Sequence, residues 1–340
     1  MSKLGAGLAL AAFFVVSPVV AQPAQLPVAA PARAVAPSVR QALSTQILTL
    51  EKQIQGRVGV AFRLVETGEG GAVAGGERFP MASTYKVAIA GALLTLVDKG
   101  QVSLDQMVSV TQRDFDQTGE VADRLIHPGI TLSVANMMEL MLTQSNNSAT
   151  DKMLELAGGP AAVTTWLRAN GIADMQVDRS VNDVLNDFYG TPEGSPFAKQ
   201  FMARGLSDAD IEKVAYSARA AFEKDPRDTS APTAMVDLLA KLLAGSLLKP
   251  ESRTFLIGVM ERCETGQARL KGLLPQGTIV AHKTGTLGGA LNDVGMITLP
   301  GGRGHLLIAV YTKSSSLPGP QRERAIAEIS RSLFDYFAMR

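Results

Sequence analysis

The sequence predicts an α/β fold of the α+β type, with an antiparallel sheet built from both ends of the chain. Three observations support this prediction. Strand-like segments lie near the two ends, helical patterns fill the stretch between them, and an amphipathic helix flanks each group of strands. The strands of both ends can pair into one sheet with the flanking helices packed on it, so the middle forms an inserted all-α lobe.

The N-terminal elements follow from the spacing of apolar residues. Ser38 can cap a helix that runs to about residue 55. One face of this helix carries Leu43, Ile47, Leu50 and Ile54. Apolar residues over 58–65 predict a strand, and the four glycines within 70–76 predict a turn after it.

Helical patterns dominate the middle of the chain, from 83 to 156. The apolar run over 85–99 ends at Gly100, which suits the left-handed position after a helix. Apolar spacing predicts two further helices, over 134–143 and 147–157.

Residues 187–227 differ from their surroundings, because they are rich in Gly and Pro and carry a polar helical pattern over 207–224. We therefore expect an inserted helical excursion there. Another helix is predicted over 232–243, and the last amphipathic helix over 321–339. The C-terminal strand candidates are 278–283, 293–299 and 305–312. The folded domain is then 38–340, with an α/β lobe over about 38–80 and 246–340 and an all-α lobe over about 81–245.

The N-terminal residues have the pattern of an export signal. Lys3 precedes an apolar run over 4–21 that ends in small residues. This pattern predicts a secretory signal peptide over 1–21; an uncleaved membrane anchor is the alternative, and Pro18 disfavours it. Residues 22–37, rich in Pro, Ala and Gln, are expected to form a flexible leader. No later segment is long and apolar enough to span a bilayer, so we expect no stable membrane anchor.

The composition excludes several classes of function. Lys and Arg number 33 and Asp and Glu 32, so the net charge of +1 lacks the basic excess of a nucleic-acid binder. The single cysteine, Cys263, can form neither an internal disulfide nor a cysteine-based metal site, and we expect it to be buried or inert. The three histidines are not paired at a helical ligand spacing. We therefore expect no metal, no cofactor and no nucleic-acid partner.

One serine–lysine pair carries a chemical signal. Ser83 and Lys86 are three residues apart at the predicted start of a helix, so their side chains share one face. A helix N-terminus offers backbone N–H groups and a positive dipole end, which suits a nucleophile whose attack creates an oxyanion. The apolar neighbours of Lys86 disfavour its charged form, so it is a candidate base.

Three short motifs stand in order along the chain. Residues 79–86 read Phe-Pro-Met-Ala-Ser-Thr-Tyr-Lys, residues 145–147 read Ser-Asn-Asn, and residues 283–286 read Lys-Thr-Gly-Thr. Together they resemble the nucleophile helix, the Ser-Asp-Asn loop and the Lys-Thr-Gly strand of class A serine β-lactamases, with Asn146 in place of the aspartate. The last motif and the residues before it resemble an extended-spectrum branch of that family. The likeness covers most of the chain apart from 187–227.

The resemblance implies a β-lactamase/DD-peptidase-like fold and a set of roles. Ser83 attacks the lactam carbonyl, Lys86 takes part in the proton transfer, and the N–H groups of Ser83 and Thr286 form the oxyanion hole. Ser145 relays a proton to the leaving nitrogen, and Asn147 binds the substrate amide and Lys86. The residues of the substrate-binding strand, whose cation and hydroxyls suit a carboxylate, are Lys283, Thr284, Gly285 and Thr286.

The sequence departs from the family where a deacylating glutamate is expected. Counting forward from Arg179 puts Val181 at that position, whereas counting back from the following Leu-Asn pair puts Asn182 there. Neither residue is a carboxylate. The loop also closes later than in the family, because residues 187–227 intervene before Asp228, which can pair with Arg179.

Asp183 is the nearest carboxylate in the same loop. It is our candidate for the base that activates the hydrolytic water, with Lys86 or Glu193 next in line. The alternative for Asp183 is a helix-capping or solvated side chain.

Three functions remain open at this point. The first is a periplasmic, monomeric β-lactamase that hydrolyses its small-molecule substrate through an acyl-enzyme on Ser83 and confers antibiotic resistance. The second is a penicillin-binding D-Ala-D-Ala carboxypeptidase-like enzyme that acts on peptidoglycan stem peptides. The third is a homologue that binds β-lactams and deacylates slowly or not at all. The breadth of the likeness favours the first, whereas the missing glutamate favours the other two.

Overall fold

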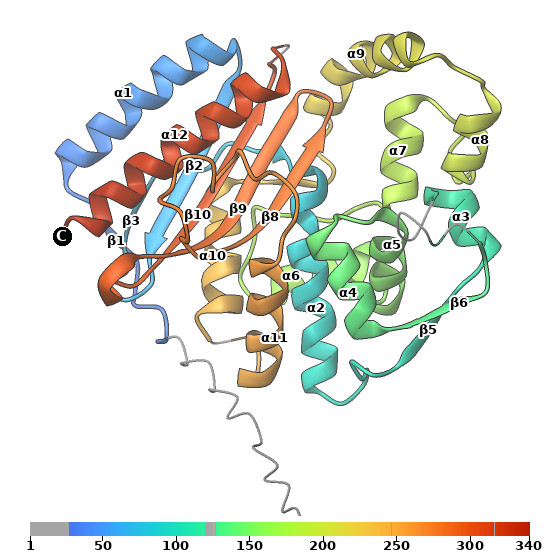
Figure 1. Ribbon diagram of the computed structural model, residues 1–340, viewed down its shortest axis with the longest axis horizontal. Helices are drawn as coiled ribbons and strands as arrows, with labels where there is room; N and C mark the ends of the chain where they lie inside the picture. Colours follow the sequence, from blue (N-terminus) through green and yellow to red (C-terminus); the bar gives the residue numbers. More distant parts are fainter. Residues whose placement is uncertain (1–26, 120–124, 126, 246, 316) are drawn as a thin grey trace, which may run out of the picture.

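A six-stranded sheet joins the two ends of the chain, in the order β1-β3-β2-β10-β9-β8 (Figure 1). The computed structural model describes residues 27–340 apart from 120–124, 126, 246 and 316, so the predicted signal peptide lies outside the described residues. The strands are β1 (Arg33–Ala34), β2 (Arg57–Leu64), β3 (Glu69–Val73), β8 (Val280–Leu287), β9 (Ala290–Thr298) and β10 (His305–Lys313). Neighbours are antiparallel except β1 and β3, which are parallel. The predicted sheet is therefore confirmed in its main features.

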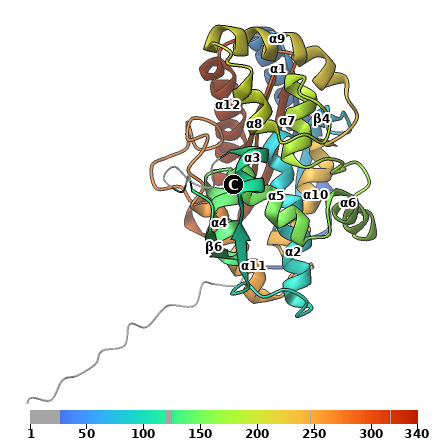
Figure 2. The ribbon, with the colours of Figure 1, turned by 90° about the vertical axis from the view of Figure 1, so that its right-hand side faces the viewer.

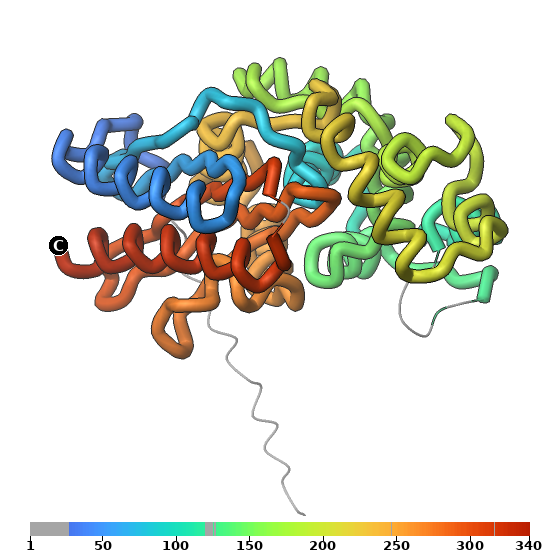
Figure 3. The backbone as a smooth tube through the Cα atoms, turned by 90° about the horizontal axis from the view of Figure 1, so that it is seen from above, coloured from blue at the N-terminus to red at the C-terminus, as the bar shows by residue number. Residues whose placement is uncertain are grey.

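Helices cover both faces of this sheet. α1 (Pro37–Ile54) and α12 (Gly319–Ala338) lie side by side on one face (Figures 1 and 3). On the other face, α10 (Pro232–Leu243) contacts β2 and β10. Val60 of β2 belongs to the apolar cluster under α1 and α12, whereas its neighbour Ala61 belongs to the cluster that continues into the helical lobe. Alternate residues of β2 thus pack into two different apolar cores, one on each face of the sheet.

The helical lobe, which faces the viewer in Figure 2, is centred on α2. Its helices before the insertion are α2 (Lys86–Asp98), α3 (Gln112–Thr118), α4 (Val134–Thr143), α5 (Asn147–Leu156) and α6 (Pro160–Ala169). α2 packs against α4, α5, α6 and α11 (Pro250–Glu261), so it is apolar on nearly every side. The lobe is not purely helical as predicted, because β5 (Met107–Val110) and β6 (Ile130–Ser133) pair in it. Each strand is only four residues long, although Val108, Ile130 and Leu132 alternate with polar residues and pack against the core of the lobe.

Three helices lie between Arg179 and Asp228, and the first of them begins before the predicted insertion over 187–227. α7 (Val181–Tyr189) begins directly after its N-cap Ser180, and α8 (Phe197–Ala203) follows it. The polar pattern over 207–224 corresponds to α9 (Asp208–Lys224), which runs back towards the sheet (Figure 1). The chain then returns through β7 (Thr229–Ser230), which pairs with β4 (Phe79–Pro80) immediately before the candidate nucleophile.

Two features near the N-terminus differ from the sequence expectations. Part of the expected flexible leader is bound, because Arg33 and Ala34 pair with β3 and Val35 is buried. Two of the glycines expected in a turn, Gly70 and Gly71, lie in β3, since pairing with β2 overrides their local preference. Within the described residues, no helix is long and apolar enough to cross a membrane.

Candidate active site

The candidate nucleophile lies where a short 3-10 turn, Ala82–Tyr85, leads into α2. Ala82 has a φ of +45°, a sparsely populated value for a residue with a side chain, and such strain is typical of functional turns. Ser83 follows it and lines a pocket next to β8. A Cβ atom on Gly285 would lie 2.4 Å from the carbonyl oxygen of Met81. The glycine of the Lys-Thr-Gly motif therefore lets β8 approach the turn closely.

Lys86 is fully buried and surrounded by oxygen acceptors. Its Nζ donates to the carbonyl of Ser145 at 2.6 Å, to Ser145 Oγ at 3.3 Å and to Asn147 Oδ1 at 3.1 Å. None of its described hydrogen bonds goes to Ser83, which the sequence placed within reach. Burial and the nearby charge of Lys283 hold the pKa of Lys86 well below its usual value. This environment favours the neutral amine, which can accept a proton.

Ser145 connects the two lysines of the site. It has a φ of +60°, and its Oγ accepts hydrogen bonds from Lys283 Nζ at 3.0 Å and from Lys86 Nζ at 3.3 Å. Lys283 also donates to the carbonyl of Thr284 at 2.9 Å. Burial lowers the pKa of Lys283 to about 8, so it is mostly charged at neutral pH. The structure thus brings the lysines of two distant motifs onto one hydroxyl.

The hydroxyls of the substrate-binding strand are held by residues outside the three motifs. Arg269 donates from Nη2 to Thr286 Oγ1 at 2.8 Å and from Nη1 to the carbonyl of Gly285 at 3.3 Å. Thr265 Oγ1 lies 2.5 Å from Thr284 Oγ1. Sequence reasoning gave Thr265 and Arg269 no role, because these contacts depend on how the loop after α11 folds back onto β8.

α7 and the inserted helix α9 supply one wall of the pocket that contains Ser83. Its lining residues are Val181, Val184 and Leu185 of α7 and Phe222 of α9. Val181 therefore shares this pocket with Ser83, whereas Asn182 does not line it. The Asn182 side chain accepts the N–H of Phe197 at 2.9 Å and donates to the carbonyl of Ser195 at 3.0 Å. Of the two possible positions for the missing glutamate, the one that lines the pocket of the nucleophile holds valine.

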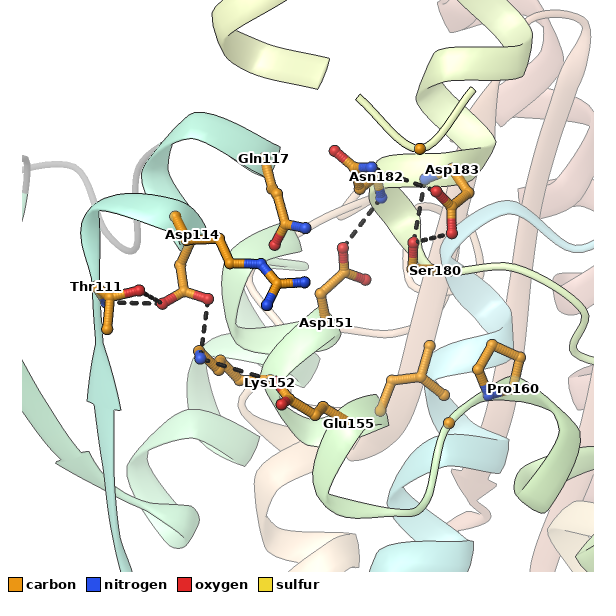
Figure 4. A pocket seen from close by; sticks show the side chains of 14 residues that line it. Thr111, Asp114, Gln117, Asp151, Lys152, Glu155, Pro160, Ser180, Asn182 and Asp183 are labelled. Atoms are coloured by element: carbon orange, nitrogen blue, oxygen red, sulfur yellow. Dashed lines mark hydrogen bonds and ion pairs between the residues drawn. The ribbon is translucent and has the colours of Figure 1, made fainter. Parts of the chain in front are cut away.

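Asp183, the sequence-based candidate for the base, does not line the pocket that contains Ser83. It lines a separate polar cavity of about 650 Å³ (Figure 4). Its carboxylate accepts hydrogen bonds from Ser180 Oγ at 2.6 Å and from Asn182 Nδ2 at 3.3 Å, and Ser180 Oγ accepts the Asp183 N–H at 3.1 Å. The structure thus favours the alternative for Asp183, a carboxylate at the capped start of its helix that accepts the hydroxyl of the N-cap Ser180.

A second carboxylate, Asp151, lines the same cavity (Figure 4). It accepts the N–H groups of Val181 at 2.7 Å and of Asn182 at 3.0 Å, so it also caps α7. Burial raises the pKa of Asp151 to about 6, although these bonds and the charge of Lys86 oppose the shift. It lies one helical turn after Asn147 on α5, so the spacing in the sequence could have identified Asp151 as a residue near the active site. No group of three or more potential metal ligands occurs in the described part of the chain.

Arg179 holds the two ends of the insertion together, as the sequence predicts. Its Nε donates to Asp228 at 2.6 Å, and its Nη1 donates to Asp187 at 2.7 Å and to Asp225 at 3.1 Å. Only 6% of the Arg179 side chain and 8% of the Asp228 side chain are exposed. Asp228 lines the pocket of Ser83, but its carboxylate is committed to Arg179.

The comparisons with known proteins agree with this geometry. A model of the β-lactamase enzyme family matches residues 42–337. β-Lactamase VEB-1 of Pseudomonas aeruginosa is 30% identical over 268 residues, which cover 76% of this chain and 78% of that protein. β-Lactamase SME-1 of Serratia marcescens is 28% identical over 295 residues, which cover 85% and 87%.

Solved structures give the same result. A β-lactamase from Chitinophaga pinensis superposes with a TM-score of 0.71 at 29% identity, covering 88% of this chain and 99% of that one. An ancestral class A β-lactamase superposes with a TM-score of 0.71 at 33% identity, covering 86% and 99%. The fold, the arrangement of the three motifs and these matches together show that the chain belongs to the β-lactamase enzyme family and has the class A fold.

Proposed function

We infer that this protein is a serine β-lactamase of class A that opens the lactam amide through an acyl-enzyme on Ser83. The observation that carries this inference is the meeting of two buried lysines, Lys86 and Lys283, on Ser145 Oγ beside the candidate nucleophile. Acyl transfer from a β-lactam requires three groups: a cation to bind the carboxylate, a neutral amine to accept a proton, and a hydroxyl to relay one.

In the acylation step, Lys86 takes the proton of Ser83 as Oγ attacks the lactam carbonyl. The N–H groups of Ser83 and Thr286 stabilise the oxyanion, because β8 lies against the nucleophile turn. The C–N bond then breaks, and Ser145 gives its proton to the leaving nitrogen and regains one from Lys86, to which it is hydrogen-bonded. The substrate carboxylate binds Lys283, and Thr284 and Thr286 add hydrogen bonds to it.

Deacylation cannot follow the family's route through a glutamate, because Val181 lines the pocket in its place. Among the described residues lining this pocket, the one carboxylate is Asp228, which Arg179 neutralises. We assign the base to Lys86, whose burial favours the neutral amine. Lys86 takes a proton from water as the hydroxide oxygen attacks the ester carbon. It then returns the proton to Ser83 Oγ as the C–O bond breaks.

The Tyr85 hydroxyl suits the task of holding this water. It is buried, lines the same pocket and has no hydrogen-bond partner in the described part of the chain. Burial raises the pKa of Tyr85 well above its usual value, so its proton remains available for a hydrogen bond.

We also propose that residues 1–21 are a signal peptide and that the mature protein acts in the periplasm as a monomer. The apolar run that precedes the folded domain supports export.

The decisive experiment is the time course of a chromogenic cephalosporin with purified mature protein. The wild type is expected to turn over many equivalents, and Ser83→Ala is expected neither to turn over nor to gain the mass of an opened lactam. A stoichiometric burst that stops would refute the hydrolase, and an adduct on Ser83→Ala would refute the choice of nucleophile. Cleavage of a D-Ala-D-Ala peptide without cephalosporin turnover would favour the carboxypeptidase instead.

A further inference from the structure

A chain of hydrogen bonds runs from the single cysteine to the substrate-binding strand. Cys263 follows α11 and is 3% exposed. Its Sγ lies 3.4 Å from Thr265 Oγ1, which in turn lies 2.5 Å from Thr284 Oγ1. Either atom can be the donor in both contacts. Since each hydroxyl has a single proton, the direction of the whole chain depends on which end accepts most strongly.

The charged groups that face the thiol come from two strands. Burial opposes ionisation of Cys263, but His282 and Lys283 of β8 outweigh it and lower the pKa of the thiol to about 7. Asp293 of β9 lies 2.9 Å from His282 Nδ1 and helps to raise the pKa of that imidazole to about 9 against its burial. Glu264, the next residue along the chain, is exposed to solvent. The cationic neighbours therefore make a thiolate accessible near neutral pH.

We propose that Cys263 is a positioning residue, whose protonation state decides whether Thr284 can donate a hydrogen bond to the carboxylate of the substrate. The proposal rests on the proposed function, because that carboxylate is the one a β-lactam carries. It adds a control element to the substrate site that none of the three motifs contains.

The two directions follow from counting protons. A neutral thiol is a weak acceptor, so Thr265 donates to Thr284, and the Thr284 proton is free for the substrate. A thiolate is a strong, charged acceptor and takes the Thr265 proton. Thr284 must then donate to Thr265 across the 2.5 Å contact and turns a lone pair towards the substrate. The carboxylate loses one hydrogen bond and faces an oxygen lone pair instead.

The binding of a β-lactam to the Ser83→Ala protein isolates this effect from catalysis. We would measure the dissociation constant of an intact cephalosporin by calorimetry between pH 6 and pH 8.5. The constant is expected to rise tenfold or more as Cys263 ionises, which corresponds to the loss of one hydrogen bond to a charged group. Absorbance at 240 nm follows the thiolate directly, because the chain contains one cysteine.

Two variants in the Ser83→Ala background separate this effect from the titration of Lys283, which also weakens carboxylate binding as pH rises. Cys263→Ser keeps a hydroxyl that does not ionise in this range, so it should bind tightly up to the pH at which Lys283 loses its proton. Thr284→Val removes the end of the chain, so it should bind more weakly at pH 6 and lose the dependence on Cys263. Thermal unfolding of each variant checks that the fold is intact.

The outcomes are separable. The proposal is wrong if Cys263→Ser shows the same pH dependence as its parent, if Thr284→Val retains the change near pH 7, or if no thiolate forms below pH 8.5. Turnover by the otherwise unchanged protein at pH 6 tests the proposed function independently. If the protein turns over and Cys263→Ser binds substrate with an unchanged pH dependence, the protein is a β-lactamase without this control. If the protein does not turn over but Cys263→Ser changes the pH dependence of binding, the proposed function is wrong and the positioning role of Cys263 stands.

Discussion

Replacing Arg179 with alanine tests whether the insertion depends on its buried ion pairs. Arg179 binds three carboxylates from both ends of the insertion, and the pair with Asp228 is almost completely buried. Removing one partner of such a pair typically costs about 3–5 kcal/mol, because the remaining charge stays buried without compensation. At about 2.1 cal/mol/K of unfolding entropy per residue, a folded domain of about 300 residues loses roughly 1.6 °C per kcal/mol, so the melting temperature should fall by roughly 5–8 °C.

Arg227 provides a matched control in the same cluster. It binds Asp187 and Asp225, but 48% of its side chain is exposed. Arg227→Ala should therefore cost less than about 1 kcal/mol, as exposed ion pairs do. Adding Asp228→Asn to Arg179→Ala should recover part of the loss, because the amide removes the unpaired charge and its oxygen can still accept the backbone N–H of Asp178.

Circular dichroism during thermal unfolding measures the loss, and limited proteolysis shows where it acts. Arg179→Ala should be cut within residues 190–227 before the rest of the chain, whereas Arg227→Ala should resist like the wild type. If Arg179→Ala melts no lower than Arg227→Ala, the two ends of the insertion do not depend on the buried Arg179–Asp228 pair, and the reasoning fails.

Further predictions concern the substrate site and deacylation. Lys283→Ala should lower kcat/KM for carboxylate-bearing β-lactams about ten- to a hundredfold, because one hydrogen bond to a charged group is lost. It should lower kcat/KM for neutral esters much less. Because the pKa of Lys283 is about 8 and the charge of Cys263 helps to raise it, the affinity of Cys263→Ser for a carboxylate-bearing substrate should fall as pH rises towards 8, at a lower pH than the deprotonation of Lys283 in the parent. Tyr85→Phe should slow deacylation several-fold and leave acylation unchanged in stopped-flow traces. A deacylation rate equal to that of the wild type would show that Tyr85 does not hold the hydrolytic water. Asp183→Asn should turn over like the wild type, and a trapped acyl adduct in its mass spectrum would return the base to Asp183.

The sequence predicted those parts of the molecule that depend on local patterns. The apolar face of α1 and the helices over 134–143 and near 147–157 follow from spacing, and the structure has them. The meeting of Lys86 and Lys283 on Ser145 could be expected from the family resemblance, and the lowered pKa of Lys86 from its apolar neighbours, but the burial and lowered pKa of Lys283 could not. Those depend on packing between elements far apart in the chain.

The orientation of α7 was beyond sequence reasoning for a related reason. Counting residues could not decide between Val181 and Asn182, because the choice depends on how the helix is rotated about its axis. That rotation is fixed by bonds to the later loop, where Asn182 contacts Ser195 and Phe197, and by Asp151 at the helix start. Asp183 was chosen for its closeness in sequence, whereas successive residues of a helix point in different directions.

The course of α9 has a mechanical consequence. Glu223 accepts hydrogen bonds from the N–H and Oγ of Ser314 at 2.8 Å, and Arg219 donates to the carbonyl of Ser315 at 3.2 Å. A Cβ atom on Gly289, in the turn between β8 and β9, would lie 2.1 Å from Glu223 Oε1. Through these contacts, the inserted helix α9 links the helical lobe to the residues that follow β10 and to the turn between β8 and β9. We therefore expect bulky substrates to be admitted by rotation of side chains that line the pocket, such as Phe222, rather than by separation of the two lobes.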